Sequence, residues 1–512
     1  MRASRLWIVT GGLLLASTST AHANVHDTFG VGVAQIGMGN AMTAFASGGA
    51  AAYYNPAGLT AKSGIRLDAG IQSFMPRFQN WEGIVYDRNQ NGVIDFDAQG
   101  TPETTTVGAA YTPVTGMGIN AGLGLTPWLG LGLSMYMPTD YLMRIQMNDP
   151  YVPYYPLYKN RVQKFSTYVG AGIKVFDGLS IGLGASIGAT ATVDGRATAV
   201  VKVVTASEDE NGNTELTQVT SSINVDDITI ALKSGMSPNA GVLLNFGWVN
   251  ENLAGLNVGA VYRGASAVKA DVKFQVNSSG DIMLGDDTIY SGPLTSEPVT
   301  VEMNAANGNQ ITSGYNPANV AVGTSYTFKD RLTVSADAIW TQWSMYQEDM
   351  ISIPTQEILI EGAAIIRVGG MRETEGDPGM KWHDTVAPRV GVQYGGPMPK
   401  GGDLGFKYAV RLGYSFVPSP VPDQTKYVNM MDSNKHVVSG GLGFEVPLPR
   451  LTNPLRVDLF GSMHALEDRI HTKEAGLAPN EYGEYPVGYP VAGTITSGGQ
   501  IFGFGGSVGL TF

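Results

Sequence analysis

The fold is decided by residues 165–188, which read FSTYVGAGIKVFDGLSIGLGASIG. On either side of Asp177-Gly178, apolar side chains alternate with small or polar ones. One face carries Phe165, Val169, Ala171, Ile173 and Val175 on the first arm, and Leu179, Ile181, Leu183, Ala185 and Ile187 on the second. Successive side chains of a strand point to opposite faces, and Asp-Gly is the sequence that a tight type I′ turn requires. The stretch therefore predicts a β-hairpin with one apolar face.

Similar alternation elsewhere predicts fourteen strands, as in a membrane barrel whose side chains face lipid and lumen in turn. They lie near residues 64–75, 105–125, 129–145, 161–175, 179–200, 226–246, 254–275, 308–328, 331–346, 382–395, 404–418, 435–447, 455–468 and 494–512. Short connections at 328–331 and 447–454 contrast with polar stretches at 276–307, 347–381 and 468–493. Short periplasmic turns opposite long external loops are typical of such barrels. We therefore expect an all-β fold, a transmembrane antiparallel β-barrel of fourteen strands.

The first residues predict a secretory signal peptide over 1–23. Arg2 and Arg5 precede an apolar run from Leu6 to Ala16, and Ala21-His22-Ala23 follows the small-x-small rule for cleavage. The mature chain would then begin near Asn24. A retained anchor is the alternative, but the run is shorter than the roughly 20 apolar residues that a spanning helix needs.

The composition narrows the class of protein further. Hydrophobic residues make up 43% of the chain, yet no later stretch is continuous enough for a membrane helix, so a membrane location requires a barrel. Gly is frequent, at 67 of 512 residues, and charged residues are scarce, at 15%. The net charge of −12 argues against nucleic acid as a partner. The absence of Cys excludes disulfides.

The last strand ends in an aromatic residue. Phe504, Val508, Leu510 and Phe512 share one face of it. A terminal aromatic on an alternating strand resembles the signal that the outer-membrane assembly machinery reads, and Phe512 is the candidate. The alternative is an ordinary edge strand.

Three segments match the G-x-S-x-G nucleophile pattern, at 178–182, 184–188 and 505–509. A nucleophile elbow needs a strand, a sharp turn and a helix, whereas these segments lie within alternating strands. The residues His26, His383, His436, His464 and His471 are scattered, without the H-E-x-x-H spacing of a metal site. The sequence therefore predicts no enzyme and no required cofactor.

One motif has the spacing of a calcium loop. Oxygen ligands would come from Asp87, Asn89, Asn91, Val93 and Asp95, with Gly92 at the sharp turn. Position twelve is Ala98, so the bidentate Glu of a full EF-hand is missing. We expect a structural Ca²⁺ site in the first external loop, with a plain polar turn as the alternative.

Several short segments, in order along the chain, resemble the long-chain fatty-acid and hydrocarbon transporter family of outer membranes (FadL/TodX type, OMPP1). The amino-terminal hatch of that family is similar to residues 29–39 and to Ala51-Ala52-Tyr53-Tyr54-Asn55-Pro56-Ala57-Gly58-Leu59. Its central hairpin is similar to residues 239–242 and 258–263, a later strand end to 341–344, and the loop after strand eleven to 419–422.

The resemblance implies a fourteen-stranded barrel over 64–512, closed inside by a hatch over 24–63. It also implies that the hatch gates a pocket, with Asn55, Pro56, Ala57 and Gly58 at the gate. A plain turn is the alternative for these four residues. Members of the family pass fatty acids or aromatic hydrocarbons from an external groove to the pocket and then sideways through the wall. A lateral exit spares an apolar solute a polar lumen.

Two regions could take part in that path. The family's wall gap lies near its third strand, where Pro138 lacks an amide donor and would interrupt the ladder; the alternative is the end of the strand. The following loop carries Tyr151, Tyr154, Tyr155 and Tyr158, which could contact an apolar ligand or form the interfacial aromatic belt.

The sequence thus predicts outer-membrane transport of hydrophobic small molecules in a Gram-negative bacterium. The partners expected are the ligand, outer-membrane lipid or lipopolysaccharide and the barrel assembly machinery, with a monomeric barrel. A general porin for polar solutes would share the barrel but lack the hatch. A structural or adhesive surface barrel is the third interpretation.

Overall fold

A computed structural model describes residues 25–61, 64–85, 99, 103–108, 113–140, 153–158, 165–188, 191–208, 214–234, 236–284, 287–293, 299–303, 311–346, 356–360, 364–368, 381–397, 405–425, 429–448, 453–473, 490 and 492–512. The predicted signal peptide, the predicted calcium ligands and Tyr151 lie outside this part of the chain. None of the helices in the described ranges is long and apolar enough to cross a membrane.

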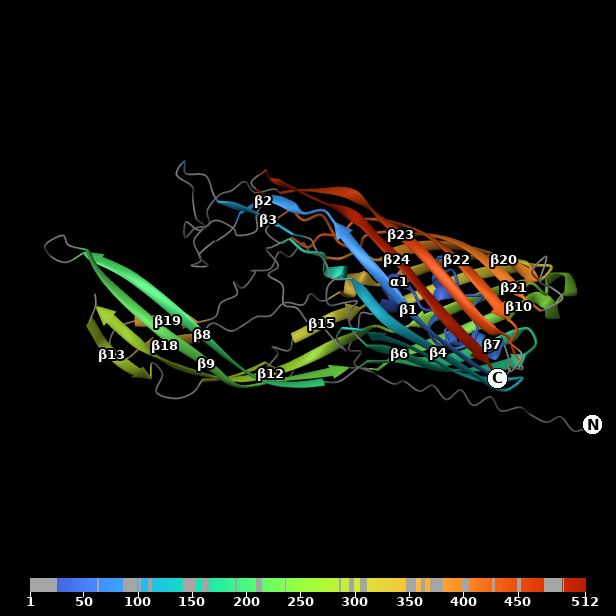
Figure 1. Ribbon diagram of the computed structural model, residues 1–512, viewed down its shortest axis with the longest axis horizontal. Coiled ribbons are helices and arrows are strands. Elements are labelled where there is room, and N and C mark those ends of the chain that lie inside the picture. Colours follow the sequence, from blue (N-terminus) through green and yellow to red (C-terminus); the bar gives the residue numbers. More distant parts are fainter. Residues whose placement is uncertain are drawn as a thin grey trace, which may run out of the picture.

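Fourteen antiparallel strands close into a barrel, as predicted (Figure 1). In barrel order they run β1, β24, β23, β22, β21, β20, β17, β16, β11, β10, β7, β6, β5 and β4. Their bounds are β1 Gly64–Phe78, β4 Val114–Thr126, β5 Leu129–Pro138, β6 Ser166–Phe176, β7 Leu179–Gly188, β10 Met236–Asn245, β11 Leu256–Arg263, β16 Asn319–Phe328, β17 Leu332–Thr341, β20 Thr385–Pro397, β21 Lys407–Val417, β22 Lys435–Val446, β23 Leu455–Thr472 and β24 Thr494–Thr511. Each of them falls on a predicted strand.

The apolar face of the alternation points outward. Leu183, Leu412 and Ile71 are among the most exposed large hydrophobic side chains, whereas Ser134, Ser325 and Ser335 on the inward face are buried. This is the reverse of a soluble barrel, because lipid rather than the protein interior covers the apolar face. The barrel therefore spans a membrane. By the usual asymmetry, the end with short turns faces the periplasm.

The barrel closes between the first and last strands. Thirteen residue pairs join β1 to β24, from Arg66–Thr511 to Phe78–Gly499. One step further, the amide of Phe512 donates to the carbonyl of Ile65 at 2.8 Å, and the amide of Ile65 donates back at 3.2 Å. The Phe512 ring itself is exposed. Its backbone therefore completes the seam, while its ring is free to contact lipid or an assembly factor.

Deleting Phe512 should lower the amount of folded, heat-modifiable barrel several-fold, because the seam loses both of these hydrogen bonds. Phe512→Ala keeps the backbone and removes only the ring. If the ring is an assembly signal, both variants should assemble poorly when folded protein is measured by heat-modified gel mobility. Normal assembly of Phe512→Ala would assign the effect to the backbone alone.

Five predicted strands were drawn too long. The strand predicted at 105–125 begins in β3 Thr104–Val107, outside the barrel, and ends in the barrel strand β4. The strands predicted at 179–200, 226–246, 254–275 and 308–328 also each divide into a barrel strand and a second strand outside the barrel. The second strands are β8 Ala191–Glu208, β9 Thr214–Ser234, β12 Ser266–Leu284 and β15 Ile311–Asn316. The predicted loop 276–307 also contains the end of β12 together with β13 Asp287–Pro293 and β14 Val299–Met303.

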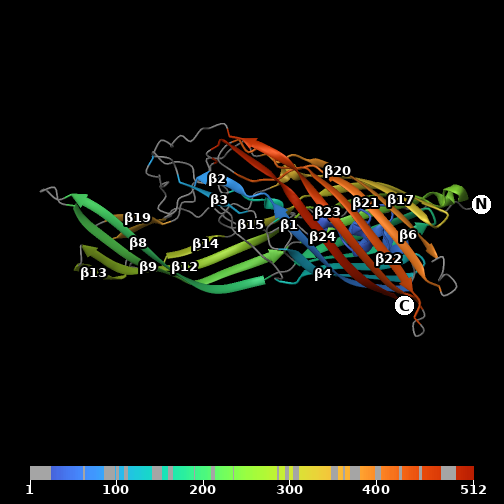
Figure 2. The same cartoon turned by 45° about the horizontal axis from the view of Figure 1, so that its top comes forward.

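These strands form a six-stranded sheet that projects far beyond the long-loop end of the barrel (Figures 1 and 2). Its centre is the pairing of β9 with β12, which joins two connections that are separate in the sequence. Two small hairpins complete the described strands. They are β2 Trp81–Val85 with β3 Thr104–Val107, and β18 Gln356–Ile360 with β19 Ala364–Val368.

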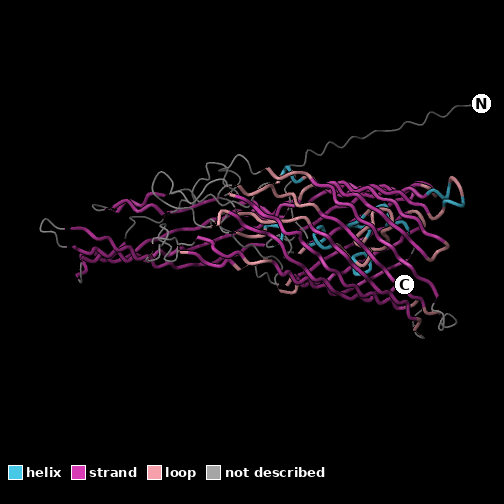
Figure 3. Tube along the Cα trace, turned by 90° about the horizontal axis from the view of Figure 1, so that it is seen from above, coloured by secondary structure: helices cyan, strands magenta, loops and turns pink. Residues whose placement is uncertain are grey.

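Residues 25–61, called the N-terminal segment below, lie within the barrel (Figure 3). They contain α1 Val25–Phe29, α2 Val33–Ile36, α3 Ala51–Tyr54 and the 3₁₀ helix η1 Pro56–Ala61. The helices are short because glycines interrupt the segment, and Gly30, Gly32, Gly39 and Gly48 adopt positive φ, which a helix does not allow. Most of its residues are buried.

Candidate functional site

Hydrogen bonds tie the N-terminal segment to strands around the barrel. The amide and hydroxyl of Thr43 both donate to Asp337 Oδ2 of β17, at 2.9 and 2.8 Å. Asn239 of β10 donates to the carbonyl of Ala52 at 2.7 Å. Ser335 of β17 donates to the carbonyl of Ala41 at 2.7 Å. Because buried backbone groups need partners, inward polar side chains of the wall hold a segment that has little regular structure.

Asn55 links the segment to itself and to the wall. Its side-chain amide donates to the carbonyls of Thr43 at 2.9 Å and of Val242, on β10, at 3.0 Å. Its side-chain oxygen accepts from the amide of Ala57 at 3.1 Å. Asn55 is extended and ends α3, so it turns the chain from α3 into η1. Replacing it would leave buried polar groups unpaired.

Inward-facing glycines let the segment lie against the wall. A Cβ at Gly182 would come within 2.2 Å of the Pro56 backbone, and one at Gly413 within 1.9 Å of the Gly39 amide nitrogen. Ser180, in the middle of the first G-x-S-x-G match, shares a 2.9 Å hydrogen bond with Thr60. This match therefore serves packing of the segment, in agreement with its predicted place in a strand.

The long-loop side of the segment is covered by an apolar cluster. Phe29 stacks on Phe74 of β1 with ring centroids 4.0 Å apart. The cluster continues through side chains from β2, the 153–158 segment and the chain after β21, including Trp81, Tyr155, Leu157, Val421, Met430 and Met431. All six are buried. Packed apolar side chains thus cover the N-terminal segment on its long-loop side.

A small pocket of about 90 Å³, called the luminal pocket below, lies on this side of the segment. Its apolar lining includes Leu157, Ile339, Trp343, Ala387, Val417 and Val437. Its charged lining consists of Arg263 from β11, Arg389 from β20, Lys435 from β22, Asp27 from α1 and Asp432 from the chain before β22, with His464 of β23 also present. Apolar and charged groups thus meet in one space, as in many small-molecule sites.

Cations outnumber carboxylates in the luminal pocket. Burial raises the pKa of the Asp432 carboxyl above its ordinary value, against hydrogen bonds from Ser419 and the charge of Lys435. Asp27 already accepts hydrogen bonds from Tyr53 at 2.7 Å and Asn316 at 2.5 Å. The pocket therefore favours a ligand with a negative or hydrogen-bond-accepting head.

Arg263 does not use all of its hydrogen-bond donors. It is 5% exposed, and its Nη1 donates to the carbonyls of Tyr53 and Tyr54 at the end of α3. Its guanidinium carbon lies 4.8 Å from the centre of the Tyr53 ring. Within the described residues, Arg263 Nε and Asn319 Oδ1 are buried without a hydrogen-bond partner. Since such atoms are rare and costly, they mark the pocket as a place for a polar group.

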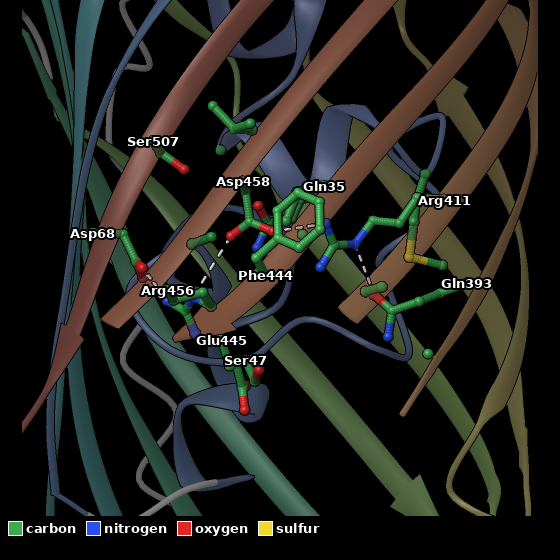
Figure 4. Close-up of a pocket in the computed structure, with 18 of the residues that line it drawn as sticks. Gln35, Ser47, Asp68, Gln393, Arg411, Phe444, Glu445, Arg456, Asp458 and Ser507 are labelled. Carbon is green, nitrogen blue, oxygen red and sulfur yellow. Dashed lines mark hydrogen bonds and ion pairs between the residues drawn. The ribbon is translucent and has the colours of Figure 1, made fainter. Parts of the chain in front are cut away.

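A larger cavity of about 350 Å³ lies on the other side of the segment, toward the short turns. Its wall is a chain of polar contacts (Figure 4). Arg411 Nε donates to Gln393 at 2.7 Å, and its Nη1 pairs with Asp458 at 2.7 Å. Arg456 bridges Asp458 and Asp68. This cavity is larger but polar. Placing an apolar solute in it would cost free energy, because the polar groups of its wall would lose the water that solvates them.

The two sides of the N-terminal segment therefore differ in chemistry. The long-loop side has an apolar cluster and a mixed pocket, and the short-turn side has a polar, charged cavity.

Comparison with known proteins bears on this architecture. The model of the outer-membrane protein transport protein family (OMPP1/FadL/TodX) matches residues 13–505. The chain belongs to the OMPP1/FadL/TodX family. This is a family of transport proteins, so the class predicted from the sequence is confirmed.

Individual relatives of this OMPP1/FadL/TodX chain are distant. It is 23% identical over 508 residues to alkane uptake protein A of Marinobacter nauticus, covering 97% of this chain and 93% of that protein. Among solved structures, a Pseudomonas aeruginosa FadL homologue is 14% identical, with a TM-score of 0.47, over 94% of this chain and 97% of the other. The P. putida toluene transporter TodX is 13% identical, with a TM-score of 0.46, over 94% and 99%.

The four gate residues predicted from the OMPP1/FadL/TodX resemblance lie together and are buried. Pro56, Ala57 and Gly58 begin η1, directly after Asn55. They meet the wall at β6, β7 and β10. Their role in gating stays a prediction.

The three described loop tyrosines have different surroundings. Tyr158 lines the luminal pocket, 5.4 Å from Lys435 Nζ. Tyr155 is fully buried against Phe78, and its hydroxyl bonds to the Gly498 backbone at 2.9 Å. Tyr154 pairs with the backbone near Met430. All three are nearly inaccessible, so none of them contributes to a lipid-facing belt.

Pro138 does not interrupt the ladder within β5. It is the last residue of β5 and pairs in register with Gly116 of β4. On the other side, β5 and β6 pair without a break from Leu129–Ile173 to Tyr136–Ser166. Pro138 thus ends the strand, which was the alternative interpretation, because a proline without an amide donor is tolerated there.

Sequence reasoning did not single out Arg263, Arg389 and Lys435. Each is the single Lys or Arg of its strand and faces inward, and charges in membrane segments are costly enough to suggest function. The sequence alone shows these inward charges. It does not show that the three side chains meet in one pocket, because they lie on three strands and the first and last of them are more than a hundred residues apart.

We expect the packing of the N-terminal segment to weaken in acid because of His26. Burial lowers its pKa from 6.5 to about 3, although the charge of Asp27 opposes the shift. Its Nδ1 shares a 2.9 Å hydrogen bond with Ser166 of β6. Because burial lowers the pKa of His26, its neutral form contributes fully to the stability of the packed state above pH 6.5. This contribution is lost as the pH falls toward 3.

At pH 4.5 the loss should be ~3 kcal/mol, which is on the order of 100-fold in favour of a dislodged segment. We expect protease cleavage within residues 25–61 and single-channel current both to rise on acidification of wild-type protein. The variant His26→Gln keeps a hydrogen-bonding group that does not titrate, and it should show a much smaller rise. Equal acid responses in both proteins would rule out His26 as the cause.

Proposed function

We propose that this protein takes up hydrophobic small molecules with one polar head, such as long-chain fatty acids, across the outer membrane. The single observation that carries this proposal is the luminal pocket, where Arg263, Arg389 and Lys435 share a lining with Leu157, Trp343 and Val437. A hydrocarbon would satisfy only the apolar part of that lining. A carboxylate would also accept hydrogen bonds from the cations, which are stronger when both groups are charged.

The pocket is large enough for a head group and the first few methylenes but not for a long chain. A volume of about 90 Å³ holds roughly three waters at the ~30 Å³ that each occupies in the liquid. The rest of a long chain would lie along the neighbouring apolar cluster. Capture would thus require the side chains of the apolar cluster to move apart, and it would end with the head in the luminal pocket.

The N-terminal segment supports a gated path rather than an open pore. It lies between the two cavities and is held by wall side chains from several strands. We propose that it acts as a hatch over residues 24–63, with Asn55 to Gly58 at the gate, and that the ligand leaves sideways into the membrane. The polar short-turn cavity supports a lateral exit, because an apolar chain gains nothing by entering it.

Three further expectations remain proposals. The loop that holds Asp87 and Asp95 would bind Ca²⁺ as a structural ion. The barrel would act as a monomer in contact with outer-membrane lipid or lipopolysaccharide. Transport would be its whole activity, without enzymatic chemistry.

Uptake of radiolabelled palmitate by cells that lack their own fatty-acid transporter tests the function. Cells making this protein should take up palmitate at least ten times faster than cells with the empty vector. Liposomes carrying the purified protein should not swell in sugar solutions, because the hatch closes the lumen. Sugar-driven swelling without palmitate uptake would favour a general porin instead.

A further inference from the structure

A row of inward-facing residues near the short turns crosses the seam where the barrel closes. Gly509 of β24 pairs with Asp68 of β1 on one side and with Arg456 of β23 on the other. The carboxylate of Asp68 and the guanidinium of Arg456 form an ion pair across Gly509, and Figure 4 shows the two side chains pointing toward each other. The first strand of the barrel is therefore bonded to the last strand but one. This row is called the first row below.

Gly509 makes the contact in the first row possible. Asp68 and Arg456 lie two strand spacings apart, or about 10 Å at ~4.8 Å per strand. A Cβ at position 509 would overlap Asp68 Oδ1 and would lie 2.9 Å from Arg456 Nη2. A side chain at this position would therefore separate the two charges.

The next inward row, called the second row below, carries the opposite charge on β23. Ser507 of β24 pairs with Gly70 of β1 and with Asp458 of β23. Asp458 is 4% exposed and pairs with Arg411 Nη1 at 2.7 Å, and Arg456 Nε lies 3.6 Å from Asp458 Oδ2. Strand β23 therefore presents a cation to β1 in the first row and a carboxylate in the second.

The alternation of apolar residues cannot distinguish registers of β1 that differ by two residues. A shift by one residue would turn the lipid-facing residues of β1 into the lumen, whereas a shift by two leaves every residue on its own face. The residues that oppose each other on the outer face of the seam are apolar or glycine: Leu67 and Leu510, Ala69 and Val508, Ile71 and Gly506. A shift by two would again place such residues opposite one another. The inward face must therefore specify the register.

The inward charges oppose one of the two possible shifts. In the observed register Asp68 lies in the first row, beside Arg456, and Arg66 lies one row nearer the mouth of the barrel. If β1 were shifted by two residues along β24, Arg66 would occupy the first row and Asp68 the second. Arg66 would then face Arg456, and Asp68 would face Asp458. Like charges on neighbouring strands are destabilising, so both contacts disfavour this register.

The opposite shift loses contacts as well. It would place Gly70 in the first row, so Arg456 would have no carboxylate across the seam. It would also carry Ile65 beyond the end of β24, and the two hydrogen bonds between Ile65 and Phe512 would be lost. Of the three registers, the observed one is the register in which Arg456 faces a carboxylate of β1.

We propose that Arg66, Asp68, Arg456 and Asp458 specify the register in which β1 closes the barrel on β24 and β23. This role does not depend on the ligand or on the proposed function. It determines the shape of the whole barrel, because the stagger of a closed sheet and its number of strands together set the tilt and the diameter. A barrel closed two residues out of register would present a different lumen to the N-terminal segment.

An exchange of the two charges on β1 tests the proposal. The variant Arg66→Asp with Asp68→Arg keeps the net charge of the protein. In the observed register the introduced arginine would face Arg456. After a shift by two residues, the introduced aspartate would face Arg456 and the introduced arginine would face Asp458. We therefore expect β1 of this variant to close two residues out of register.

Disulfides on the lipid-facing side report the register, because the chain contains no Cys of its own. Ala69→Cys with Val508→Cys joins residues that are opposite in the observed register. Ala69→Cys with Gly506→Cys joins residues that would be opposite after the shift. Residues displaced by two positions are about 7–8 Å apart, which is too far for an unstrained disulfide. Val438→Cys with Met463→Cys, opposite each other on β22 and β23, is the matched control.

With the natural charges, oxidation of the folded protein should link position 69 to position 508 and not to position 506. In the charge-exchanged variant, the disulfide between 69 and 506 should become the main product, and the yield of the one between 69 and 508 should fall roughly tenfold. The control disulfide should form equally in both backgrounds. If 69 and 508 remain the main linked pair in the folded variant, the proposal is overturned, and shape sets the register, as where Phe74 lies against Gly503.

A second variant decides the question if the charge-exchanged protein does not assemble. Arg66→Gln with Asp68→Asn removes both charges from β1, so the charges of β23 no longer distinguish the registers. Both reporter disulfides should then form, each in its own Cys pair. Formation of the disulfide between 69 and 508 alone would overturn the proposal. Heat-modified gel mobility identifies the folded fraction in which the disulfides are counted.

Discussion

Removal of residues 25–61 is expected to raise the ion conductance of the purified protein at least tenfold. The N-terminal segment lies between the luminal pocket and the polar short-turn cavity and is bound to the wall by hydrogen bonds such as those of Thr43 and Asn55. Without it, the two spaces would merge into one water-filled path, as in other wide barrels. Single-channel recording in planar bilayers measures the change.

The same deletion should lower palmitate uptake toward the level of cells with the empty vector. The pocket loses Asp27 and Tyr53, and Arg263 loses the two carbonyls at the end of α3. A double variant, Asn55→Ala with Pro56→Ala, keeps the bulk of the segment and serves as the comparison. It should impair uptake while conductance stays low. If the deletion variant folds but conducts no better than wild type, the segment does not close the lumen.

Replacing Lys435 or Arg389 with Met is expected to weaken palmitate binding roughly ten- to hundredfold. A hydrogen bond to a charged group contributes about 1.5–3 kcal/mol, and each change removes a cation from the luminal pocket but keeps most of the apolar stem. Binding of hexadecane, which has the same chain length but no carboxylate, should change less than twofold. Equilibrium dialysis with both labelled ligands measures the difference.

Two variants sharpen this result. Lys435→Arg keeps the charge and should retain most of the affinity for palmitate. Lys407→Met removes a cation from the short-turn cavity, where Lys407 pairs with Glu445 at 3.2 Å, and should leave binding unchanged. Equal losses for palmitate and hexadecane would mean that the lysine and arginine shape the pocket without contacting a head group.

The barrel could be predicted because every wall strand is read from one repeating pattern. Leu183 and Ile181 face outward while Gly182 and Ser180 face inward, and this difference is visible at a spacing of two. The number of strands followed from the same pattern. The strand ends did not, because β7 and β8 are separated by only two residues and β8 continues as a strand. No change in alternation marks the place where a strand leaves the barrel.

The candidate site was less accessible to sequence reasoning. Asn55 and Pro56 could be named because they form a short motif that resembles a known family. Arg263 and Lys435 are single residues in strands β11 and β22, and only the closure of the barrel brings them to one pocket.

The projecting sheet has a consequence for how this surface protein can diversify. Strands β8, β9 and β12 contain 18, 21 and 19 residues, so the sheet reaches about 60 Å at ~3.3 Å per residue. A hairpin lengthens by one residue on each arm, which leaves the shear and diameter of the barrel beneath it untouched. The sheet can therefore be extended, shortened or exchanged during evolution while the strands that cross the membrane stay unchanged.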